Sequence, residues 1–340
     1  MTRRARDLVV VGASAGGVEA LCGFVAGLPP DLAASVLVVL HLPAGGTSAL
    51  PAILDRAGPL PARTARHGQE LEYGAIHVAP PNHHILVADG RVALSHGPTE
   101  NGRRPAINAL FRSAAMDAGP AVIGVLLSGV LDDGVAGLVS IVSRGGVTVV
   151  QDPDEALYRS MPRHALATLH VDHVLPVGDM GAALAKLTRE EVEVAGTPAS
   201  TSLMLMENDI AATDAVAQHG REPEQIGRIS GFTCPDCDCS LVEVEPGTRY
   251  RCRVGHAWTA EALLDAQGAA WERALWAAIR TLEEKASLSR RMADNARDRG
   301  NHSLAERYLL LAEEATEAAA LLREPLTVAG RRGPREQDAR

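Results

Sequence analysis

Aromatic residues, positive charge and long apolar runs are all scarce in this chain of 340 residues. Phe, Trp and Tyr make up 3% of the sequence, so the core must consist mostly of Val, Leu, Ile and Ala. The 33 Lys and Arg residues face 42 Asp and Glu residues, and this net charge of −9 argues against broad binding to nucleic acids or anionic membranes. No apolar run approaches the roughly 20 residues of a spanning helix, so we expect no membrane insertion. The remaining composition is that of an ordinary globular protein.

Cysteine is also rare, and the sequence has five of them. Cys22 stands alone, whereas the other four lie between Cys234 and Cys252. Such a cluster suits a metal site in a reducing compartment better than a disulfide framework. The basic start of the chain resembles an export signal, but Asp7 interrupts it and only the short apolar run Leu8–Val11 follows. We therefore interpret that run as a first strand and expect a cytoplasmic protein.

Short runs of branched apolar residues alternate with segments of helical periodicity between residue 8 and about residue 188. Continuous apolar strands separated by helices are typical of a parallel sheet that is covered on both faces. The predicted fold is α/β, a doubly wound, mostly parallel sheet over residues 6–190, with a β-hairpin inserted near residues 82–94. The predicted strands are Leu8–Val11, Val36–Leu40, Ala75–Val78, Ile85–Val87, Arg91–Leu94, Val122–Leu127, Val147–Val150 and Val174–Val177. The predicted helices include Val18–Ala26, Ala106–Ala118 and Gly134–Arg144.

The second half of the sequence changes character several times. Apolar residues step by three and four from Trp271 to Ala296 and again from Leu304 to Leu322, with turn residues at 298–301 between them. This pattern predicts an antiparallel pair of helices. The predicted order after the first domain is a linker over residues 191–229, a cysteine-containing unit over 230–258, a helical hairpin over 259–326 and a disordered tail over 327–340.

A glycine-rich segment, Gly12–Gly17, lies where the first strand meets the first helix. Such a turn offers free N–H groups either to a phosphate or to the oxyanion formed when a nucleophile at the turn attacks a carbonyl. The spacing is not Gly-x-Gly-x-x-Gly, because Ser14 occupies the middle position. The second strand ends in His41 and not in the acidic residue that binds a ribose hydroxyl, which disfavours a dinucleotide site.

Ser14, His41 and the pair Asp132 and Asp133 all follow strands of the predicted parallel sheet. Because residues after parallel strands meet at one edge, these groups can form a serine nucleophile, an imidazole base and an orienting carboxylate. Simpler alternatives exist for each residue alone: Ser14 and Asp133 can be helix caps, and His41 can be a hydrogen-bonded loop residue. The joint placement at strand ends favours the catalytic interpretation.

Several motifs carry a family resemblance over roughly residues 6–188. They are Gly12-Ala13-Ser14-Ala15-Gly16-Gly17, the segment around His41, Val78-Ala79-Pro80-Pro81-Asn82-His83-His84, Arg104-Pro105, Ser128-Gly129 with Asp133-Gly134, and Gln151-Asp152-Pro153 with Met161-Pro162. The order and spacing resemble the catalytic domain of chemotaxis protein-glutamate methylesterases of the CheB type. The resemblance implies that Ser14 is the nucleophile, His41 the base and Asp133 the orienting acid. The implied reaction hydrolyses glutamate γ-methyl esters on chemoreceptor helices and releases methanol, with glutamine deamidation as a second activity and no cofactor.

The resemblance also implies an oxyanion and substrate pocket formed by Ala15, Gly16, Val130 and Arg104. This chain has Ala15 where the family usually has Thr, and Val130 followed by Leu131 where the family usually has Met followed by Gly. These departures place the identity of the substrate in question more than the ester chemistry. The first predicted strand begins at Leu8, which leaves no room upstream for the receiver domain of typical members. We therefore expect a stand-alone form that is not controlled by phosphorylation in cis.

The cysteine-containing unit has the ligand spacing of a metal site. Cys234, Cys237, Cys252 and His256 give the pattern C-x₂-C-x₁₄-C-x₃-H, which predicts a structural Zn²⁺ in a zinc-ribbon-like hairpin. Cys239 is a substitute ligand or a plain buried thiol. The alternating residues Arg249, Arg251 and Arg253 share one strand face; we favour a solvated face over a phosphate-binding one and expect no nucleic acid.

The apolar stripe of the helical hairpin indicates packing, either within the chain or against a partner helix. The expected partner is the chemoreceptor bundle itself or another signalling protein. Three further functions stay open from the sequence. One is a non-catalytic regulatory protein that binds a receptor, another is an esterase that acts on a different protein substrate, and the third is a nucleotide-binding module. Intact Ser14, His41 and Asp133 argue against the non-catalytic protein, and the missing carboxylate after the second strand argues against the nucleotide-binding module.

Overall fold

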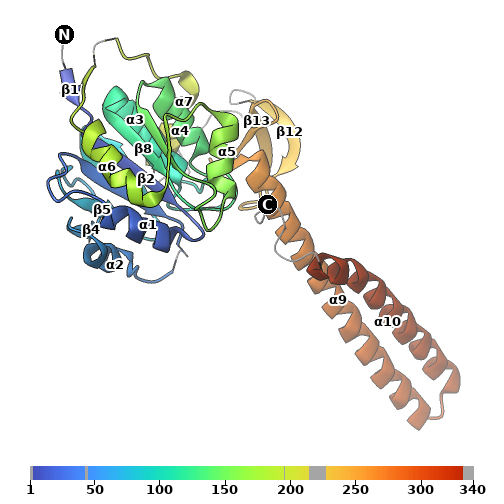
Figure 1. Cartoon of the computed structure of the whole chain (residues 1–340). Coiled ribbons are helices and arrows are strands. Elements are labelled where there is room, and N and C mark those ends of the chain that lie inside the picture. Colours follow the sequence, from blue (N-terminus) through green and yellow to red (C-terminus); the bar gives the residue numbers. More distant parts are fainter. Residues whose placement is uncertain (1–2, 43–44, 195, 214–226, 332–340) are drawn as a thin grey trace. The chain divides into compact units, whose positions relative to one another are not determined.

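The computed structural model describes residues 3–42, 45–194, 196–213 and 227–331. Its contacts divide the chain into two compact units, Met1–Leu263 and Leu264–Arg340. The first unit contains the large sheet seen in Figure 1 and also the cysteine-containing unit. No helix in the described ranges is both long enough and apolar enough to span a membrane.

A seven-stranded sheet forms the centre of the first unit, and all of its strands are parallel. The strand order is β10-β9-β8-β2-β3-β5-β4. The three central strands are buried along their whole length, which explains their unbroken apolar sequences. The strands are β2 (Leu8–Ala13), β3 (Ser35–Leu40), β4 (Ala62–Thr64), β5 (Ile76–Val78), β8 (Val122–Leu126), β9 (Val147–Gln151) and β10 (His173–Leu175).

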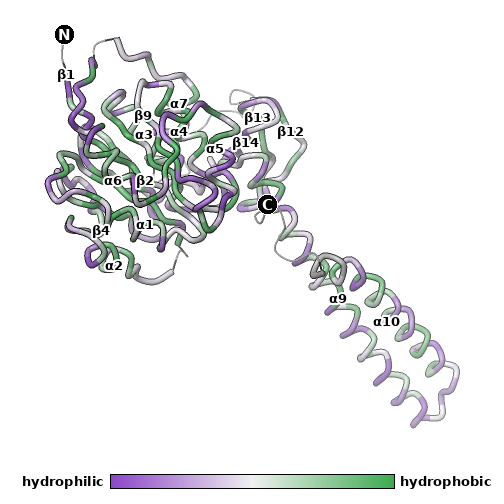
Figure 2. Tube along the Cα trace, in the orientation of Figure 1, coloured by the Kyte–Doolittle hydropathy of each residue, from purple (hydrophilic) through white to green (hydrophobic). Residues whose placement is uncertain are grey.

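Helices cover both faces of this sheet, as Figure 1 shows. One face packs against α1 (Gly17–Ala26), α2 (Leu50–Ala57) and α6 (Val177–Leu187). The other face packs against α3 (Ile107–Ala118), α4 (Val135–Ser143) and α5 (Ser160–Thr168), with a short 3₁₀ turn η1 (Gly119–Ala121) leading into β8. The core strands carry the hydrophobic colour of Figure 2. The predicted doubly wound α/β fold is confirmed.

Two small sheets flank this core. Strands β6 (His84–Ala88) and β7 (Arg91–Ser95) form the predicted antiparallel hairpin, which packs on α3. Strand β1 (Arg3–Ala5) pairs with β11 (Glu191–Glu193), a pairing that the sequence did not reveal.

Part of the predicted linker over residues 191–229 belongs to the folded unit. Besides β11, it contains α7 (Ser202–Ala212), whose side chains at Met204, Glu207 and Ile210 are buried. The hydroxyl of Thr201 caps this helix by accepting a hydrogen bond from the Met204 amide at 3.1 Å. The linker interpretation was therefore wrong for this stretch, because an isolated run of eleven residues shows too little periodicity to reveal its buried face. Residues 214–226 lie outside the described ranges.

The cysteine-containing unit is a four-stranded antiparallel sheet with the order β12-β13-β14-β15. Its strands are β12 (Arg228–Thr233), β13 (Ser240–Glu245), β14 (Arg249–Cys252) and β15 (Ala257–Thr259). The backbone of β15 also bonds to the first domain. Asn101 donates its amide to the Ala257 carbonyl at 2.7 Å, and Ala257 donates its amide to the Thr99 carbonyl at 3.1 Å. The sheet is thus joined to the α/β domain by main-chain hydrogen bonds.

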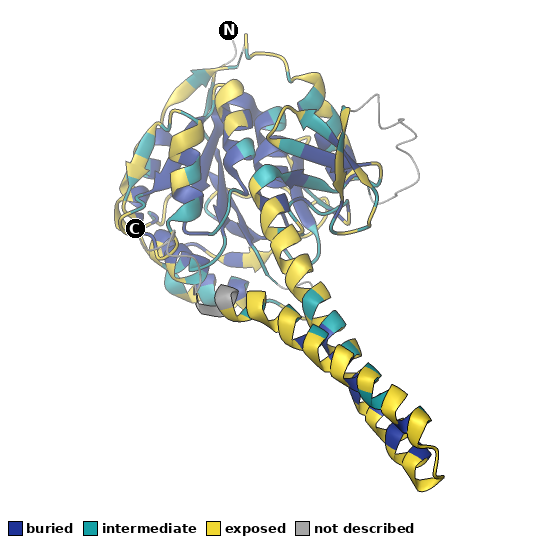
Figure 3. Cartoon of the chain, turned by 90° about the vertical axis from the view of Figure 1, so that its right-hand side faces the viewer, coloured by how far each residue is buried: buried dark blue, intermediate teal, exposed yellow. Residues whose placement is uncertain are grey.

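The second unit is an antiparallel pair of helices, as predicted (Figure 1). Helix α9 (Ala260–Asp298) begins in the first unit, and α10 (His302–Arg331) follows a turn at Gly300. Figure 3 shows buried residues along the seam and exposed residues elsewhere on the pair. The helix extends to Arg331, so the predicted disordered tail over 327–340 was wrong at its start; residues 332–340 lie outside the described ranges. The most buried residues of the seam are Ile279, Ala286, Ala293, Ala305, Ala312, Ala315 and Ala319.

Candidate active site

Ser14 lies in the turn between β2 and α1. The turn requires a left-handed backbone at Gly16, whose φ is +66°, and a Cβ there would come within 2.9 Å of the Ser128 hydroxyl. Glycine avoids both the strain and the clash. The Ser14 amide donates to the Ser128 carbonyl at 2.9 Å, which joins this turn to the loop that follows β8. The local sequence therefore fixes Ser14 at the carboxyl edge of the sheet.

Ser14, His41 and Asp133 form one hydrogen-bonded series. His41 Nδ1 lies 3.0 Å from Ser14 Oγ, and His41 Nε2 lies 2.7 Å from Asp133 Oδ2. The side chains of His41 and Asp133 are almost completely buried. In the Ser-His-Asp template of the proteases, Nε2 faces the serine and Nδ1 the aspartate, so the two ring nitrogens exchange places here.

Asp133 sits among hydrogen-bond donors at the start of α3. Its carboxylate accepts from the backbone amides of Ile107 at 2.8 Å, Asn108 at 3.2 Å and Gly134 at 3.0 Å. Burial alone would raise the pKa of this carboxyl. However, the hydrogen bond and charge of His41, together with the Ile107 and Asn108 amides, hold the pKa below its usual value. Asp133 is thus an anion at neutral pH and can stabilise a protonated imidazole.

Asp132, its neighbour, points elsewhere. Its Oδ1 accepts a hydrogen bond from the Thr259 hydroxyl at 2.8 Å, and burial raises the pKa of this carboxyl. The residues alone left both aspartates as candidates for the orienting acid. The structure separates them: Asp133 faces His41, and Asp132 faces the cysteine-containing unit.

Three of the four predicted pocket residues lie next to Ser14 in the chain or in the loop after β8: Ala15 and Gly16 follow Ser14, and Val130 belongs to the loop over residues 128–134, which we call the catalytic loop. Among the described residues, the backbone amides of Ala15 and Val130 donate to no other protein group, so both are free to bind a substrate oxygen. Met161, which the sequence singled out only as part of a family motif, is fully buried and leaves no room for a Cβ at Gly129. Its amide donates to the Gly129 carbonyl at 2.9 Å. Met161 is thus packed beneath the loop next to Ser14.

Arg104 lies beside the β6–β7 hairpin. Its guanidinium donates to Asn82 Oδ1 at 2.7 and 3.0 Å and to the carbonyls of His96 and Gly97 at 2.9 Å. These four bonds tie together the loops on either side of the hairpin. The structure therefore gives Arg104 protein partners, and its contribution to a substrate pocket stays a prediction.

A buried cluster of charges joins α3 and α7 to the cysteine-containing unit. Glu207 on α7 forms ion pairs with Arg112, Arg249 and Arg251, and Arg112 also pairs with Glu100. Burial would raise the pKa of Glu207, but the charges of Arg249, Arg112 and Arg251 lower it to about 2.

This cluster corrects the solvated-face interpretation of the three arginines. Arg251 is buried and Arg249 is mostly buried, whereas Arg253 is exposed as predicted. The sequence could not reveal this arrangement, because the partner Glu207 lies in the segment that was interpreted as a linker.

The four predicted metal ligands converge in the cysteine-containing unit. The Sγ atoms of Cys234, Cys237 and Cys252 and one nitrogen of His256 all lie within 4.8 Å of one another. His256 Nδ1 is 3.7 Å from Cys234 Sγ and 3.6 Å from Cys252 Sγ, and the Sγ atoms of Cys237 and Cys252 are 3.6 Å apart. A tetrahedral zinc with bonds of about 2.3 Å to sulfur needs edges of roughly 3.7 Å. The donor set and its spacing fit Zn²⁺, and Cys239 is not part of the cluster.

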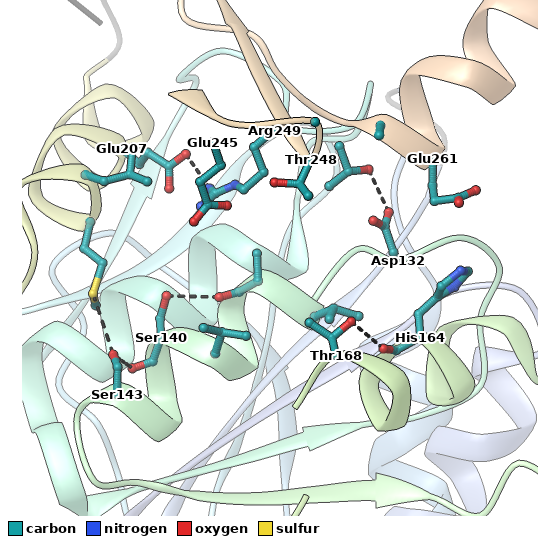
Figure 4. Close-up of a pocket in the computed structure, with 18 of the residues that line it drawn as sticks. Asp132, Ser140, Ser143, His164, Thr168, Glu207, Glu245, Thr248, Arg249 and Glu261 are labelled. Atoms are coloured by element: carbon teal, nitrogen blue, oxygen red, sulfur yellow. Dashed lines mark hydrogen bonds and ion pairs between the residues drawn. The ribbon is translucent and has the colours of Figure 1, made fainter. Parts of the chain in front are cut away.

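A cavity of about 700 Å³ lies between α4, α5, α7 and the cysteine-containing unit. Figure 4 shows Asp132, His164 and Glu261 along one side of this cavity and Glu207 and Arg249 on the other. The catalytic loop therefore borders an open space at Asp132, immediately next to the acid of the hydrogen-bonded series.

A parallel α/β domain with a serine, a histidine and an aspartate in series has the architecture of a serine hydrolase. The chain belongs to the CheB methylesterase family, whose sequence model matches residues 9–184. The predicted family resemblance is thereby confirmed for this part of the chain.

Two relatives illustrate the similarity. "Protein-glutamate methylesterase/protein-glutamine glutaminase 2" of Anaeromyxobacter dehalogenans (strain 2CP-C) is 41% identical over 183 residues, which are 54% of this chain and 54% of the relative. "Protein-glutamate methylesterase/protein-glutamine glutaminase 1" of Geobacter metallireducens is 36% identical over 177 residues, 51% of this chain and 48% of the relative. The chain therefore spans about half the length of the curated relatives it matches.

A solved structure agrees with this assignment. The crystal structure of the Thermotoga maritima CheB methylesterase catalytic domain superposes with a TM-score of 0.51 at 29% identity. The match covers 53% of this chain and 98% of that domain.

Proposed function

We propose that this protein is a protein-glutamate methylesterase that hydrolyses glutamate γ-methyl esters on chemoreceptors and releases methanol. The observation that carries the proposal is the unbroken series Ser14 Oγ, His41 and Asp133, with separations of 3.0 and 2.7 Å. The names of the relatives add glutamine deamidation as a second activity of the same site.

The proposed mechanism is acyl transfer to Ser14. An ionised carboxylate can only accept, so His41 donates its Nε2–H to Asp133 and keeps the Nδ1 lone pair free for the Ser14 proton. Ser14 Oγ attacks the ester carbonyl while His41 takes that proton, and Asp133 stabilises the imidazolium. His41 then gives the proton to the leaving methanol. A water activated by the same nitrogen releases glutamate and regenerates Ser14.

The oxyanion is proposed to bind at the unpaired amides of Ala15 and Val130, with Gly16 and Arg104 shaping the surrounding pocket. Backbone donors make this role independent of the side chains that differ from the family pattern. Ala15 supplies an amide although it lacks the hydroxyl of the usual Thr. The departures at residues 130 and 131 are therefore expected to alter substrate fit more than the ester chemistry.

The other parts of the chain have proposed roles of their own. Cys234, Cys237, Cys252 and His256 would hold a structural Zn²⁺, which supplies folding energy and no step of the reaction. The helical pair is proposed to bind a helical partner, either the chemoreceptor bundle or another signalling protein. The proposed location is the cytoplasm, with no nucleic acid as a partner.

The test is methanol release from a methylated chemoreceptor cytoplasmic bundle. The wild-type protein should release methanol, Ser14→Ala should release none, and the exposed control Ser303→Ala should match the wild type. A fluorophosphonate should covalently label the wild type and Ser303→Ala but not Ser14→Ala. Labelling of Ser14 without methanol release would leave a serine hydrolase with another ester as substrate and would reject the methylesterase proposal.

A further inference from the structure

The catalytic loop holds a backbone conformation that its sequence does not favour. Leu131 has a φ of +61°, in the left-handed region where a residue with a Cβ is strained. Next to it, Asp132 borders the cavity of about 700 Å³, so dense packing does not hold this side of the loop in place. A strained segment beside an open space must be held by specific bonds.

Two side chains supply such bonds from outside the loop. His164 Nδ1 lies 2.9 Å from the Leu131 carbonyl oxygen, and the Thr259 hydroxyl donates to Asp132 Oδ1 at 2.8 Å. The dashed line that ends at Asp132 in Figure 4 is the second of these bonds. The bonds act on the two residues that come directly before Asp133.

Thr259 belongs to the cysteine-containing unit. It ends β15, three residues after the metal ligand His256, and its amide donates to Asn101 Oδ1 at 2.8 Å. The Cys252 amide donates to the His256 carbonyl at 3.0 Å, so the turn that carries these two ligands leads directly into β15. An ion that holds the turn would therefore also hold the strand on which Thr259 lies.

We propose that Thr259 is a positioning residue for the catalytic loop and that metal binding at the Cys/His cluster stabilises the active geometry through it. The proposal rests on the proposed esterase function, since it concerns the loop that carries Asp133 and the Val130 amide. The catalytic loop would then have two states. In the metal-bound state Thr259 holds Asp132, and without the ion Leu131 relaxes and Asp133 loses its alignment with His41.

The first test replaces the hydroxyl alone. Thr259→Val should lower kcat for methanol release about tenfold with KM within about twofold, because the change affects alignment and not substrate binding. Thr259→Ser should restore kcat. The matched control is Thr248→Val, which changes a threonine of the same unit on the same cavity that forms no side-chain hydrogen bond among the described residues. An equal loss of kcat in the control would overturn the proposal.

A second variant separates positioning from a structural role, because the Thr259 hydroxyl also accepts from the Ala262 amide at 3.2 Å and so caps α9. Asp132→Ala should lower kcat about tenfold by itself, and adding Thr259→Val should lower it no further. Thr259→Val also removes the cap of α9, so it should reduce the melting temperature by the same amount in the wild type and in Asp132→Ala. If Thr259→Val reduces kcat by the same factor with and without Asp132, the residue acts as a cap only.

The metal link is tested without turnover. Cys237→Ser should abolish bound zinc in native mass spectrometry, and hydrogen exchange of a peptide covering residues 128–134 should then accelerate about tenfold, as it should in Thr259→Val. Cys239→Ser lies outside the cluster and should keep both the zinc and the slow exchange. Chelation of zinc from the wild type gives the same comparison if Cys237→Ser fails to fold.

Unchanged exchange in the metal-free protein would overturn the link between the metal and the loop. Exchange needs no substrate, so this result is independent of methanol release. If the wild type releases no methanol, the proposed function fails while the exchange data still decide the inference.

Discussion

The orientation of one imidazole ring decides how the candidate site works. His41 presents Nδ1 to Ser14 and Nε2 to Asp133, and the hydrogen bond and charge of His41, together with the Ile107 and Asn108 amides, keep the Asp133 carboxyl ionised. The charge on Asp133 fixes the proton on Nε2, which leaves Nδ1 as the base. The tautomer of His41 therefore depends on Asp133 being a carboxylate.

Asp133→Asn tests this dependence. The Asn oxygen in the place of Oδ1 would accept from the Asn108 and Gly134 amides, and its NH₂ group in the place of Oδ2 would face His41 Nε2 and the Ile107 amide. The ring proton would move to Nδ1, which could no longer accept the proton of Ser14. We expect kcat for methanol release to fall about 10³–10⁴-fold with KM little changed, by analogy with the template triad. Steady-state kinetics on a methylated receptor bundle measure both values.

Asp132→Asn is the matched control for that variant. An Asn oxygen at this position can still accept from the Thr259 hydroxyl, so kcat should stay within about threefold of the wild type. Similar losses in both variants would mean that the two aspartates share one role and would contradict the assignment. Strand position could not separate these neighbours, since both follow the same strand, and only the family resemblance pointed to Asp133. Burial and the remote partner Thr259 distinguish them.

Among the elements, α7 and the cysteine-containing unit show most clearly where sequence reasoning stops. The ligand spacing of Cys234 to His256 is local, and it predicted a cluster whose atoms lie within 4.8 Å of one another. Glu207, in contrast, is a buried ion-pair partner only because Arg112, Arg249 and Arg251, which are distant in the sequence, lie next to it in the fold. A buried ion cluster has no periodicity and no spacing rule, so its members look like ordinary surface charges.

Glu207→Gln should expose the energetic role of this cluster. The folded-state pKa of about 2 lies below the ordinary 4.5, so the carboxylate contributes stability that is fully present above pH 4.5. That contribution is lost as the pH falls from about 4.5 towards 2. At pH 7 we expect the free energy of unfolding of the variant to be about 3 kcal/mol lower than that of the wild type. This difference should shrink as the pH falls below 4.5. Urea denaturation at several pH values measures the difference.

The control for this experiment is Glu191→Gln. Glu191 is 65% exposed and lies 4.0 Å from Arg3, so its replacement should change stability by less than about 0.5 kcal/mol at every pH. A constant difference between Glu207→Gln and the wild type from pH 7 to pH 3 would show that Glu207 is not ionised in the folded protein.

For the whole molecule, the order of domains was largely predictable because each part has its own periodicity. Alternating strands and helices indicated the α/β domain, and apolar steps of three and four indicated the helical pair. The prediction for α10 was less accurate: the apolar steps that begin at Leu304 include Tyr308 and Leu311, but the neighbouring alanines at 305 and 312 are more deeply buried than these three residues. Small residues let the two helices approach closely, which leaves the larger side chains half-buried at the edge of the seam.

The division into two units predicts where the chain can be shortened. A chain ending at Leu263 keeps the Cys/His cluster, Thr259 and all partners of Glu207, so it should bind zinc and melt within about 5 °C of the full-length protein. A chain ending at Gly227 should lose at least about 3 kcal/mol, because Glu207 and Glu100 would lose Arg249 and Arg251.

Kinetics of the longer fragment then assign a role to the helical pair. If this pair binds the receptor bundle, the chain ending at Leu263 should show a higher KM for methanol release from the bundle with kcat unchanged, since only binding energy common to substrate and transition state is removed. Its rate with a small soluble ester should equal that of the full-length protein. A fall in kcat with the small ester would instead mean that the helices support the active site itself, and an unchanged KM with the bundle would assign them to a partner other than the receptor.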